Sequence, residues 1–239
     1  METLQALRAE AEALTSALSE MPAAAWDRPT RCDPWRVRDV VGHVITALGR
    51  VPVMIAAPAP AAADTTAPGY YRPDERFGST TDADRISTAQ NRADAPPPML
   101  VEELADTWRT VVTVSESQPP DRVVHTRHGD AMLLTDFLAT RVIELALHGL
   151  DIADGAGSRP WLTPAATEVV LETMFGAGWR TVGWDQETLV RKSTGRAPVS
   201  AAEIEYLRGA GYCGDWPSVH RRLLQVDNPH YVNLSGLAD

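Results

Sequence analysis

The sequence predicts an all-α protein, a four-helix bundle followed by further helices towards its C-terminal end. Apolar residues recur at spacings of three and four along four long segments, which is the period of an amphipathic helix. No segment shows the sustained alternation of apolar and polar residues that indicates a strand. A chain of 239 residues, 44% hydrophobic and 23% charged, has the composition of a soluble globular protein and can bury one large core, or one core with an appendage.

The first two expected helices have clear apolar stripes. One runs from Glu2 to about Met21, with its stripe at Leu4, Leu7, Ala11, Leu14 and Leu18. The other runs from Pro34 to about Arg50, with Asp33 as its N-cap and a proline at its first position, where a missing N–H costs nothing. His43 lies at the margin of the second stripe, beside Gly42, where a neighbouring backbone or a ligand can approach closely.

The other two expected helices lie further along the chain. One spans about Met99 to Ser115, and the other spans Met132 to Ile152, with Gly155 and Gly157 as stop signals after it. Four helices with these apolar faces form a bundle, and bundles place metal or cofactor sites on inward-facing side chains of different helices.

Residues 56–98 are expected to form a long loop between the second and third helices. This stretch is rich in proline and alanine and shows no clear periodicity, so it is either a functional lid or a partly ordered segment. Five of its residues are candidates for contact with a ligand: Tyr70, Tyr71, Arg72, Arg76 and Phe77. The alternative is that they are surface residues without a role in binding.

The sequence of the C-terminal part predicts short helices and not a separate α/β domain. Thr163 and Pro164 supply a cap and first position for a helix to about Gly176, and a second helix follows over Asp185–Lys192. Ser200 and Glu203 form a capping box that opens a third, and a last helix follows Trp216. We therefore expect a bundle over residues 1–155 and a helical extension over 156–239 that packs on it.

Charge and composition exclude several classes of partner. The net charge of -10, with no cluster of basic residues, argues against nucleic acid or an anionic membrane as partner. No apolar run reaches about 18 residues, and the N-terminus lacks the pattern of a signal peptide, so a cytoplasmic location is expected. The chain is expected to be a monomer or a homodimer. Cys32 and Cys213 form neither a disulfide framework nor a metal-spaced pair, so essential sulfur chemistry would need a thiol from outside.

The fourth helix carries a row of ionisable residues. At about 100° per residue, the four side chains fall within a sector of roughly 80° on an otherwise apolar helix; they are Arg141, Glu144, His148 and Asp151. Buried charges cost several kcal/mol unless they are paired or bind a metal. The row is therefore either a solvated face with an i,i+4 pair or a place where chemistry occurs.

His43 with Glu144 and His148 makes a candidate metal set. The i,i+4 spacing puts Glu144 and His148 one helical turn apart, so both can reach one ion. Three N/O ligands leave a zinc ion with an open position, which is the arrangement of catalytic sites. The order is the reverse of the H-E-x-x-H of zinc proteases, so the pattern does not indicate a peptidase, and a di-iron centre would need two Glu-x-x-His pairs.

Two separated runs resemble a known family. The run WDRPTRCDPWRVRDVVGH, from Trp26 to His43, and the run GDAMLLTDFLATRVIELALHGLDIADG, from Gly129 onward, are similar to the DinB-like proteins grouped as the mycothiol-dependent maleylpyruvate isomerase family. The second run carries that family's R-x-x-E-x-x-x-H-x-x-D helix. The resemblance covers about residues 1–155, and VRKSTGRAPVSAAE is similar to the tail of some members.

This resemblance implies a DinB-like bundle that holds a divalent metal, usually zinc, at His43, Glu144 and His148. It also implies mycothiol, the low-molecular-weight thiol of actinobacteria, as co-substrate. The frequent use of arginine, alanine and aspartate, typical of a high-GC bacterial genome, agrees with this source. A metal lowers the pKa of a bound thiol, and the thiolate would attack a small electrophile, either to give a conjugate (a transferase) or to exchange cis for trans geometry (an isomerase). Arg141 is counted with the catalytic residues. Together with Asp151 it would orient the metal ligands; the alternative for each of the two residues is a plain ion pair.

Two other functions stay open at this point. One is a thiol-independent metalloenzyme with water in the open position and Glu144 or His128 as base; the other is a non-catalytic bundle that binds a metal or small molecule. His128 could also act as a proton shuttle or fourth ligand. The 56–98 insertion and the missing α/β domain both depart from the isomerase, so the identity of the electrophile is open.

Overall fold

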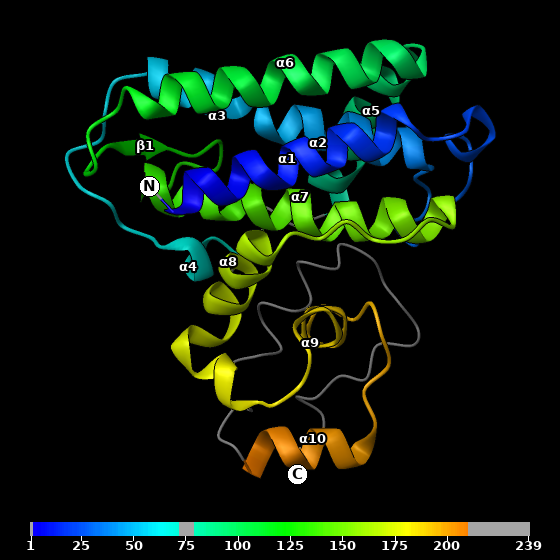
Figure 1. Cartoon of the computed structure of the whole chain (residues 1–239). Helices are drawn as coiled ribbons and strands as arrows, with labels where there is room; N and C mark the ends of the chain where they lie inside the picture. Colours follow the sequence, from blue (N-terminus) through cyan, green and yellow to red (C-terminus); the bar gives the residue numbers. More distant parts are fainter. Residues whose placement is uncertain (1, 72–78, 210–239) are drawn as a thin grey trace.

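The all-α class is confirmed. The computed structural model describes residues 2–71 and 79–209, and its core is a bundle of four long helices (Figure 1). These are α1 (Glu2–Ser19), α2 (Val37–Leu48), α6 (Pro97–Glu116) and α7 (Leu134–Ala156). Helices α1 and α2 each contact both α6 and α7, and their facing stripes form one continuous hydrophobic core.

Helix α7 is the central element of the molecule. It contacts α1 and α2 within the bundle and α8 (Pro164–Phe175) on its other side, so it is covered almost all round. This position explains why its sequence is apolar on nearly every face, because a helix buried on all sides has no solvated face to fill with polar residues. The helix ends at Gly157, whose φ of 67° makes it the left-handed cap, whereas Gly155 lies inside the last turn.

The prediction of a long loop over 56–98 was wrong, because much of this range is helical. Helix α3 (Arg50–Ala56) follows α2 directly, α4 (Ala67–Tyr70) is a single turn, and α5 (Ser79–Ala93) packs against α2. The buried side chains described on α5 are Arg85 and the small Ala89 and Ala93, which give little hydrophobic periodicity. Arg72, Arg76 and Phe77 lie outside the described residues.

Gly42 lets α5 approach α2 closely. A Cβ placed on Gly42 would lie 2.6 Å from the backbone oxygen of Ala89, so the position next to His43 needs a glycine. The close neighbour expected beside His43 is therefore a helix backbone.

The start of α2 also differs from its prediction. The helix begins at Val37 and not at Pro34, and its N-cap is Arg36 and not Asp33. The Oδ2 atom of Asp39 accepts a hydrogen bond of 2.8 Å from the Arg36 backbone N–H, which satisfies the helix end from within its first turn. The preceding residues instead fold back, and Thr30 N donates to Trp35 O, so this segment approaches the interior of the bundle.

A small hairpin precedes α7. Strands β1 (Val123–His125) and β2 (Ala131–Leu133) pair antiparallel, with Gly129 at a φ of 89° in the connection. The sequence showed no strong strand signal here, because three residues are too few to display alternation.

The C-terminal helices start where their capping residues predict. The Thr163 hydroxyl accepts a hydrogen bond from Ala166 N at the start of α8, and Asp185 accepts from Thr188 N at the start of α9 (Gln186–Ser193). The Ser200 and Glu203 capping box opens α10 (Ala201–Gly209). A short 3-10 helix, Gly176–Thr181, joins α8 to α9, and another, Ala23–Ala25, follows α1. The predicted last helix and Cys213 lie outside the described residues.

One segment of the described chain, Val37–Ala56, is long and apolar enough to cross a membrane by length and composition. Charged residues such as Arg38 and Asp39 interrupt this segment, so it does not stand out in the sequence as an unbroken apolar run. In the most apolar window of this segment, 61% of the residues are buried inside the protein. The segment consists of α2 and α3, which pack in the core.

A buried glutamate joins α1 to the start of α8. Glu10 is 1% exposed, and its Oε2 atom accepts a hydrogen bond of 2.8 Å from Thr163 N. Its Oε1 atom has no hydrogen-bond partner among the described residues. Burial raises the pKa of Glu10, although the hydrogen bonds to Thr163 oppose this effect. Because the folded-state pKa lies above the unfolded value, folding is favoured by this group at low pH and the contribution is lost as pH rises through the folded pKa.

We therefore expect Glu10→Gln to increase the free energy of unfolding at pH 8 by about 1 kcal/mol, since it removes a buried charge and keeps an acceptor for Thr163. The gain should shrink towards pH 4.5, where Glu10 itself becomes protonated. Urea unfolding at both pH values measures the change. The exposed Glu12→Gln on the same helix is the matched control. A Glu10 variant that is less stable at pH 8, or whose pH dependence equals that of the control, would contradict this account.

Candidate metal centre

The row of ionisable residues on α7 faces the interior of the protein. Arg141, His148 and Asp151 are 2%, 5% and 0% exposed, and the Glu144 side chain is 12% exposed. A solvated face is therefore excluded. Each charge in the row needs a partner in the interior, because an unpaired buried charge costs several kcal/mol.

His43 of α2 meets this row at its centre. Its Nε2 atom lies 3.1 Å from Glu144 Oε2, and His148 Nε2 lies 3.4 Å from the same oxygen. One ligand atom from each of the three side chains lies within 4.8 Å of the others. Ligands at zinc distances of 2.0–2.1 Å in a tetrahedron are about 3.3 Å apart. The three side chains are therefore close enough together to bind a single metal ion.

Trp35 covers the two imidazoles. Its ring centroid lies 4.8 Å from that of His43 and 6.3 Å from that of His148. Trp35 is brought there by the backbone that folds back before α2, and it is 4% exposed. It restricts the rotation of both rings and excludes water from this side of the centre.

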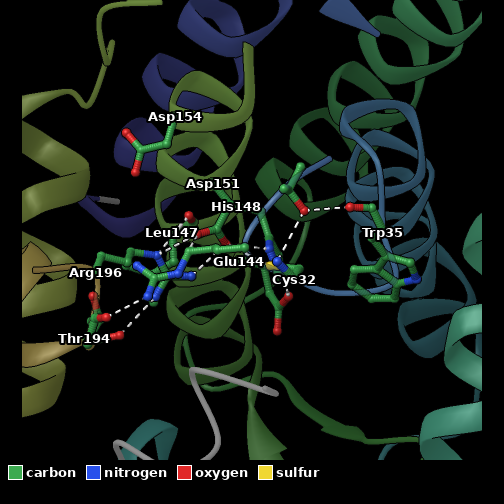
Figure 2. Close-up of polar contacts among 12 residues, drawn as sticks. Cys32, Trp35, Glu144, Leu147, His148, Asp151, Asp154, Thr194 and Arg196 are labelled. Carbon is green, nitrogen blue, oxygen red and sulfur yellow. Dashed lines mark hydrogen bonds and ion pairs between the residues drawn. The ribbon is translucent and has the colours of Figure 1, made fainter. Parts of the chain in front are cut away.

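Asp151 fixes the orientation of His148. Its Oδ2 atom lies 3.1 Å from His148 Nδ1 (Figure 2), so this nitrogen carries the proton and Nε2 is directed to Glu144 and His43. A carboxylate behind a ligating histidine in this way sets the ring tautomer and makes Nε2 a better ligand.

Asp151 is itself held by an arginine from the C-terminal region. Arg196 Nη2 and Nε lie 2.6 and 2.9 Å from the two carboxylate oxygens, Arg31 Nε lies 4.0 Å away, and the Cys32 thiol donates to Oδ2 at 3.3 Å. Arg196 and Trp35 were not singled out from the sequence, and Cys32 was considered there only as a cysteine without a disulfide or metal-spaced partner. All three stand in runs that the family resemblance had marked, but spacing alone gives no reason to join them to α7.

The charges of the centre are set by these contacts. Burial alone would raise the pKa of Glu144, but hydrogen bonds from His148 and His43 and the charge of Arg141 lower it well below its ordinary value. Burial opposes a charge on His148, but hydrogen bonds to Asp151, Cys32 and Glu144 raise its pKa well above the usual range. Burial lowers the pKa of His43 to about 4. Glu144 is therefore an anion between a neutral and a charged imidazole.

A second group of possible ligands, formed by Cys32, His148 and Asp151, fits a cation less well. Both oxygens of Asp151 already accept hydrogen bonds from Arg196, whose positive charge would repel a metal. Burial, and then the charge of Asp151, raise the pKa of Cys32, which opposes formation of the thiolate ligand. Cys32 is a buried free thiol, in agreement with its prediction.

Arg141 and His128 lie at the edge of the centre. Arg141 Nη2 is 3.9 Å from Glu144 Oε1, and its Nη1 donates to Ala47 O at 3.3 Å. His128 does not belong to the set of three; it lies in the hairpin connection, where its ring is 6.0 Å from that of Tyr70. Tyr71 is buried and donates to Thr140 O at 3.3 Å.

The fold and the site together define an all-α bundle with a buried set of two histidines and one carboxylate. Residues 7–153 match the family model described as the mycothiol maleylpyruvate isomerase N-terminal domain, and the chain belongs to this family. The family suspected from the two motifs is confirmed. Its description names an isomerase, which agrees with the prediction that the protein is an enzyme.

Two solved structures are similar to this chain. This chain is similar to the crystal structure of the mycothiol-dependent maleylpyruvate isomerase and to that of a mutant of it, with TM-scores of 0.49 and 0.48. Both are 12% identical to this chain, and each comparison covers 73% of this chain and 68% of the other. No curated protein sequence matches the chain.

Proposed function

We propose that this protein is a metal-dependent, mycothiol-using enzyme that acts on a small electrophile, with His43, Glu144 and His148 as ligands of zinc. The observation that carries the proposal is the convergence of these three side chains from two helices, with ligand atoms within 4.8 Å of one another. The family supports mycothiol and an isomerase. The geometry supports a divalent metal with one open position.

The bound metal would supply a lowered thiol pKa, so that the thiolate is available at neutral pH. Glu144 is the one anionic ligand among the three. A divalent ion held by it and two neutral imidazoles would keep a net positive charge, which favours binding of the thiolate as a second anion. His148 binds through Nε2 because Asp151 holds its Nδ1 proton. Arg141 stabilises the ionised form of Glu144 and limits its rotation. Trp35 shields the imidazoles from water.

The reaction proposed is addition of sulfur to an electrophilic carbon. On a conjugated cis double bond, the new C–S bond leaves a single bond between the former alkene carbons, and this bond can rotate. Elimination of the thiol then restores the double bond in the trans form, and the thiol is regenerated. If elimination does not follow, protonation of the neighbouring carbon gives the conjugate. The same residues therefore serve an isomerase or an S-transferase.

We further propose that residues 156–239 form an extension packed on a 1–155 bundle. We also propose that the protein acts in the cytoplasm of an actinobacterium. The support for the extension is that α8 packs on α7 and α1, and that Arg196 reaches Asp151 across this boundary.

The test is an assay of the zinc-loaded chain with maleylpyruvate and with simple conjugated enones, each with and without mycothiol. We expect turnover only when thiol is added, with a trans product or a conjugate found by mass spectrometry. Turnover at full rate without thiol would overturn the proposal in favour of water at the open position. The absence of turnover with every substrate, together with a Glu144→Gln variant that changes only the melting temperature, would indicate a non-catalytic bundle.

A further inference from the structure

A groove with a volume of about 530 Å³ runs along one face of α6, and we call it the α6 groove. Figure 1 shows α6 at the edge of the bundle that lies opposite α8, α9 and α10. Gly49 and Pro52, at the start of α3, line the groove from a second element. Six residues of α6 line it: Met99, Glu102, Glu103, Asp106, Thr107 and Thr110. None of these residues belongs to the candidate metal centre.

The α6 groove has the length of a short helix. Its six α6 positions follow the spacing i, i+3, i+4, i+7, i+8 and i+11, which is one face of a helix. At a rise of about 1.5 Å per residue, this face is about 16 Å long. Gly49 has no side chain that could fill the space beside it. An amphipathic helix of about three turns therefore matches the groove, as in other proteins that bind helical segments in this way.

Apolar side chains are exposed at the α6 groove. Met99 is 58% exposed, and Val53, the neighbour of Pro52 in the chain, is 70% exposed. The described residues include one further exposed large hydrophobic side chain, which is Tyr206 on α10. Methionine is flexible and polarisable, so it adapts well to the shape of a partner. Exposed apolar side chains that gather in one place beside polar residues are typical of an interaction site.

The charged residues that line the α6 groove are all acidic. They are Glu102, Glu103 and Asp106. Glu103 forms an ion pair with Arg92. Asp106 lies 3.5 Å from Arg109, but both side chains are more than half exposed, so this pair is weak. Glu102 forms no ion pair with any described residue, so two of the three carboxylates can pair with a cation on a partner.

A second copy of this chain fits the α6 groove poorly. Each copy carries a net charge of -10, so two copies repel each other. A symmetric contact through this groove would also bring its carboxylates face to face, which is unfavourable. A basic partner is attracted instead, both by the groove and by the acidic chain as a whole.

We propose that the α6 groove is the docking site for a basic amphipathic helix of another protein. An apolar side chain of that helix lies against Met99 and Pro52, and lysine or arginine side chains beside it pair with Glu102 and Asp106. The apolar contact supplies most of the affinity, whereas the charges set the orientation and exclude acidic helices. Docking requires no metal, thiol or substrate, so this inference goes beyond the proposed function and does not depend on it.

The experiment uses a labelled helical peptide of about four turns, stapled to hold its helix, with leucines along one face and lysines on both sides of them. The full chain is titrated into it, and fluorescence anisotropy reports binding. We expect saturable binding that Met99→Gln weakens roughly fivefold to tenfold through the lost apolar contact. Glu102→Lys should weaken it roughly tenfold. The matched control is Glu172→Lys, which makes the same change in net charge on an exposed side chain of α8 and should change binding less than roughly twofold.

A counterpart peptide with glutamate in place of every lysine should not bind. Equal weakening by Glu102→Lys and Glu172→Lys would show attraction to net charge alone and overturn the proposal. Absence of binding, binding that Met99→Gln leaves unchanged, or equal binding of the acidic peptide would also overturn it. Met99 and Glu102 are exposed, so both variants should keep the melting temperature of the parent, and a loss of binding then reports on the groove.

Sedimentation of the chain without peptide tests the other occupant. We expect the sedimentation of the parent and of Met99→Gln to be the same. A parent dimer that Met99→Gln converts to a monomer would place a second copy in the α6 groove and overturn the basic partner.

Discussion

Replacing His148 with alanine is expected to remove both the metal and the turnover of this enzyme. The parent chain should retain about one zinc per molecule after dialysis, and His148→Ala should retain less than roughly a tenth of that, because two ligands do not hold the ion. Elemental analysis of the dialysed protein gives the metal content, and the thiol-dependent assay gives the rate.

The effect should be specific to the position and not to the loss of any imidazole. His125→Ala, on the exposed side of β1, is the matched control and should keep the metal and the rate. Circular dichroism checks that the His148 variant is folded, which is expected because Asp151 keeps its bonds to Arg196. Full activity of a metal-free sample, or a His148 variant that still holds one zinc, would refute the assignment of the centre.

The sequence was sufficient to predict the helices that surround this centre. Their apolar stripes have a strong period, and the caps at Thr163, Asp185 and Ser200 act through contacts only three residues long. The juxtaposition of Glu144 and His148 follows in the same way from helix geometry. The approach of His43 required a second helix, and the motif resemblance supplied the reason to pair them.

What the sequence did not show depends on contacts between distant segments. Helix α5 was missed because its described buried side chains, Arg85, Ala89 and Ala93, form no apolar stripe, and its close approach to α2 requires Gly42. Arg196 is separated from Asp151 by 45 residues, and no periodicity relates them. The wrong start of α2 has a local cause, since Asp33 and Pro34 have the residue types of a helix start, but Arg36 and Asp39 satisfy that end instead.

Replacing Asp151, the partner of Arg196, is expected to have the second large effect. Asp151 both stabilises the fold and orients His148. Asp151→Asn keeps the shape of the side chain and removes the charge that balances buried Arg196. We expect a loss of about 3–5 kcal/mol in the free energy of unfolding, since one partner of a buried ion pair is left uncompensated. Zinc affinity should also fall by roughly tenfold to hundredfold, because Asn no longer fixes the charge and tautomer of His148. Urea unfolding and competition with a zinc chelator measure the two quantities.

A double substitution separates these two roles of Asp151. In Asp151→Asn combined with Arg196→Met, the buried arginine charge is absent, so most of the lost stability should return. The zinc affinity should stay low, because the carboxylate behind His148 is still missing. The exposed Asp154→Asn, one turn along α7 in an ion pair with Arg191, should cost less than about 1 kcal/mol and leave zinc affinity unchanged. If zinc affinity returned together with stability in the double variant, Asp151 would act on the metal centre only through the stability of the fold, and the orienting role assigned to it would be wrong.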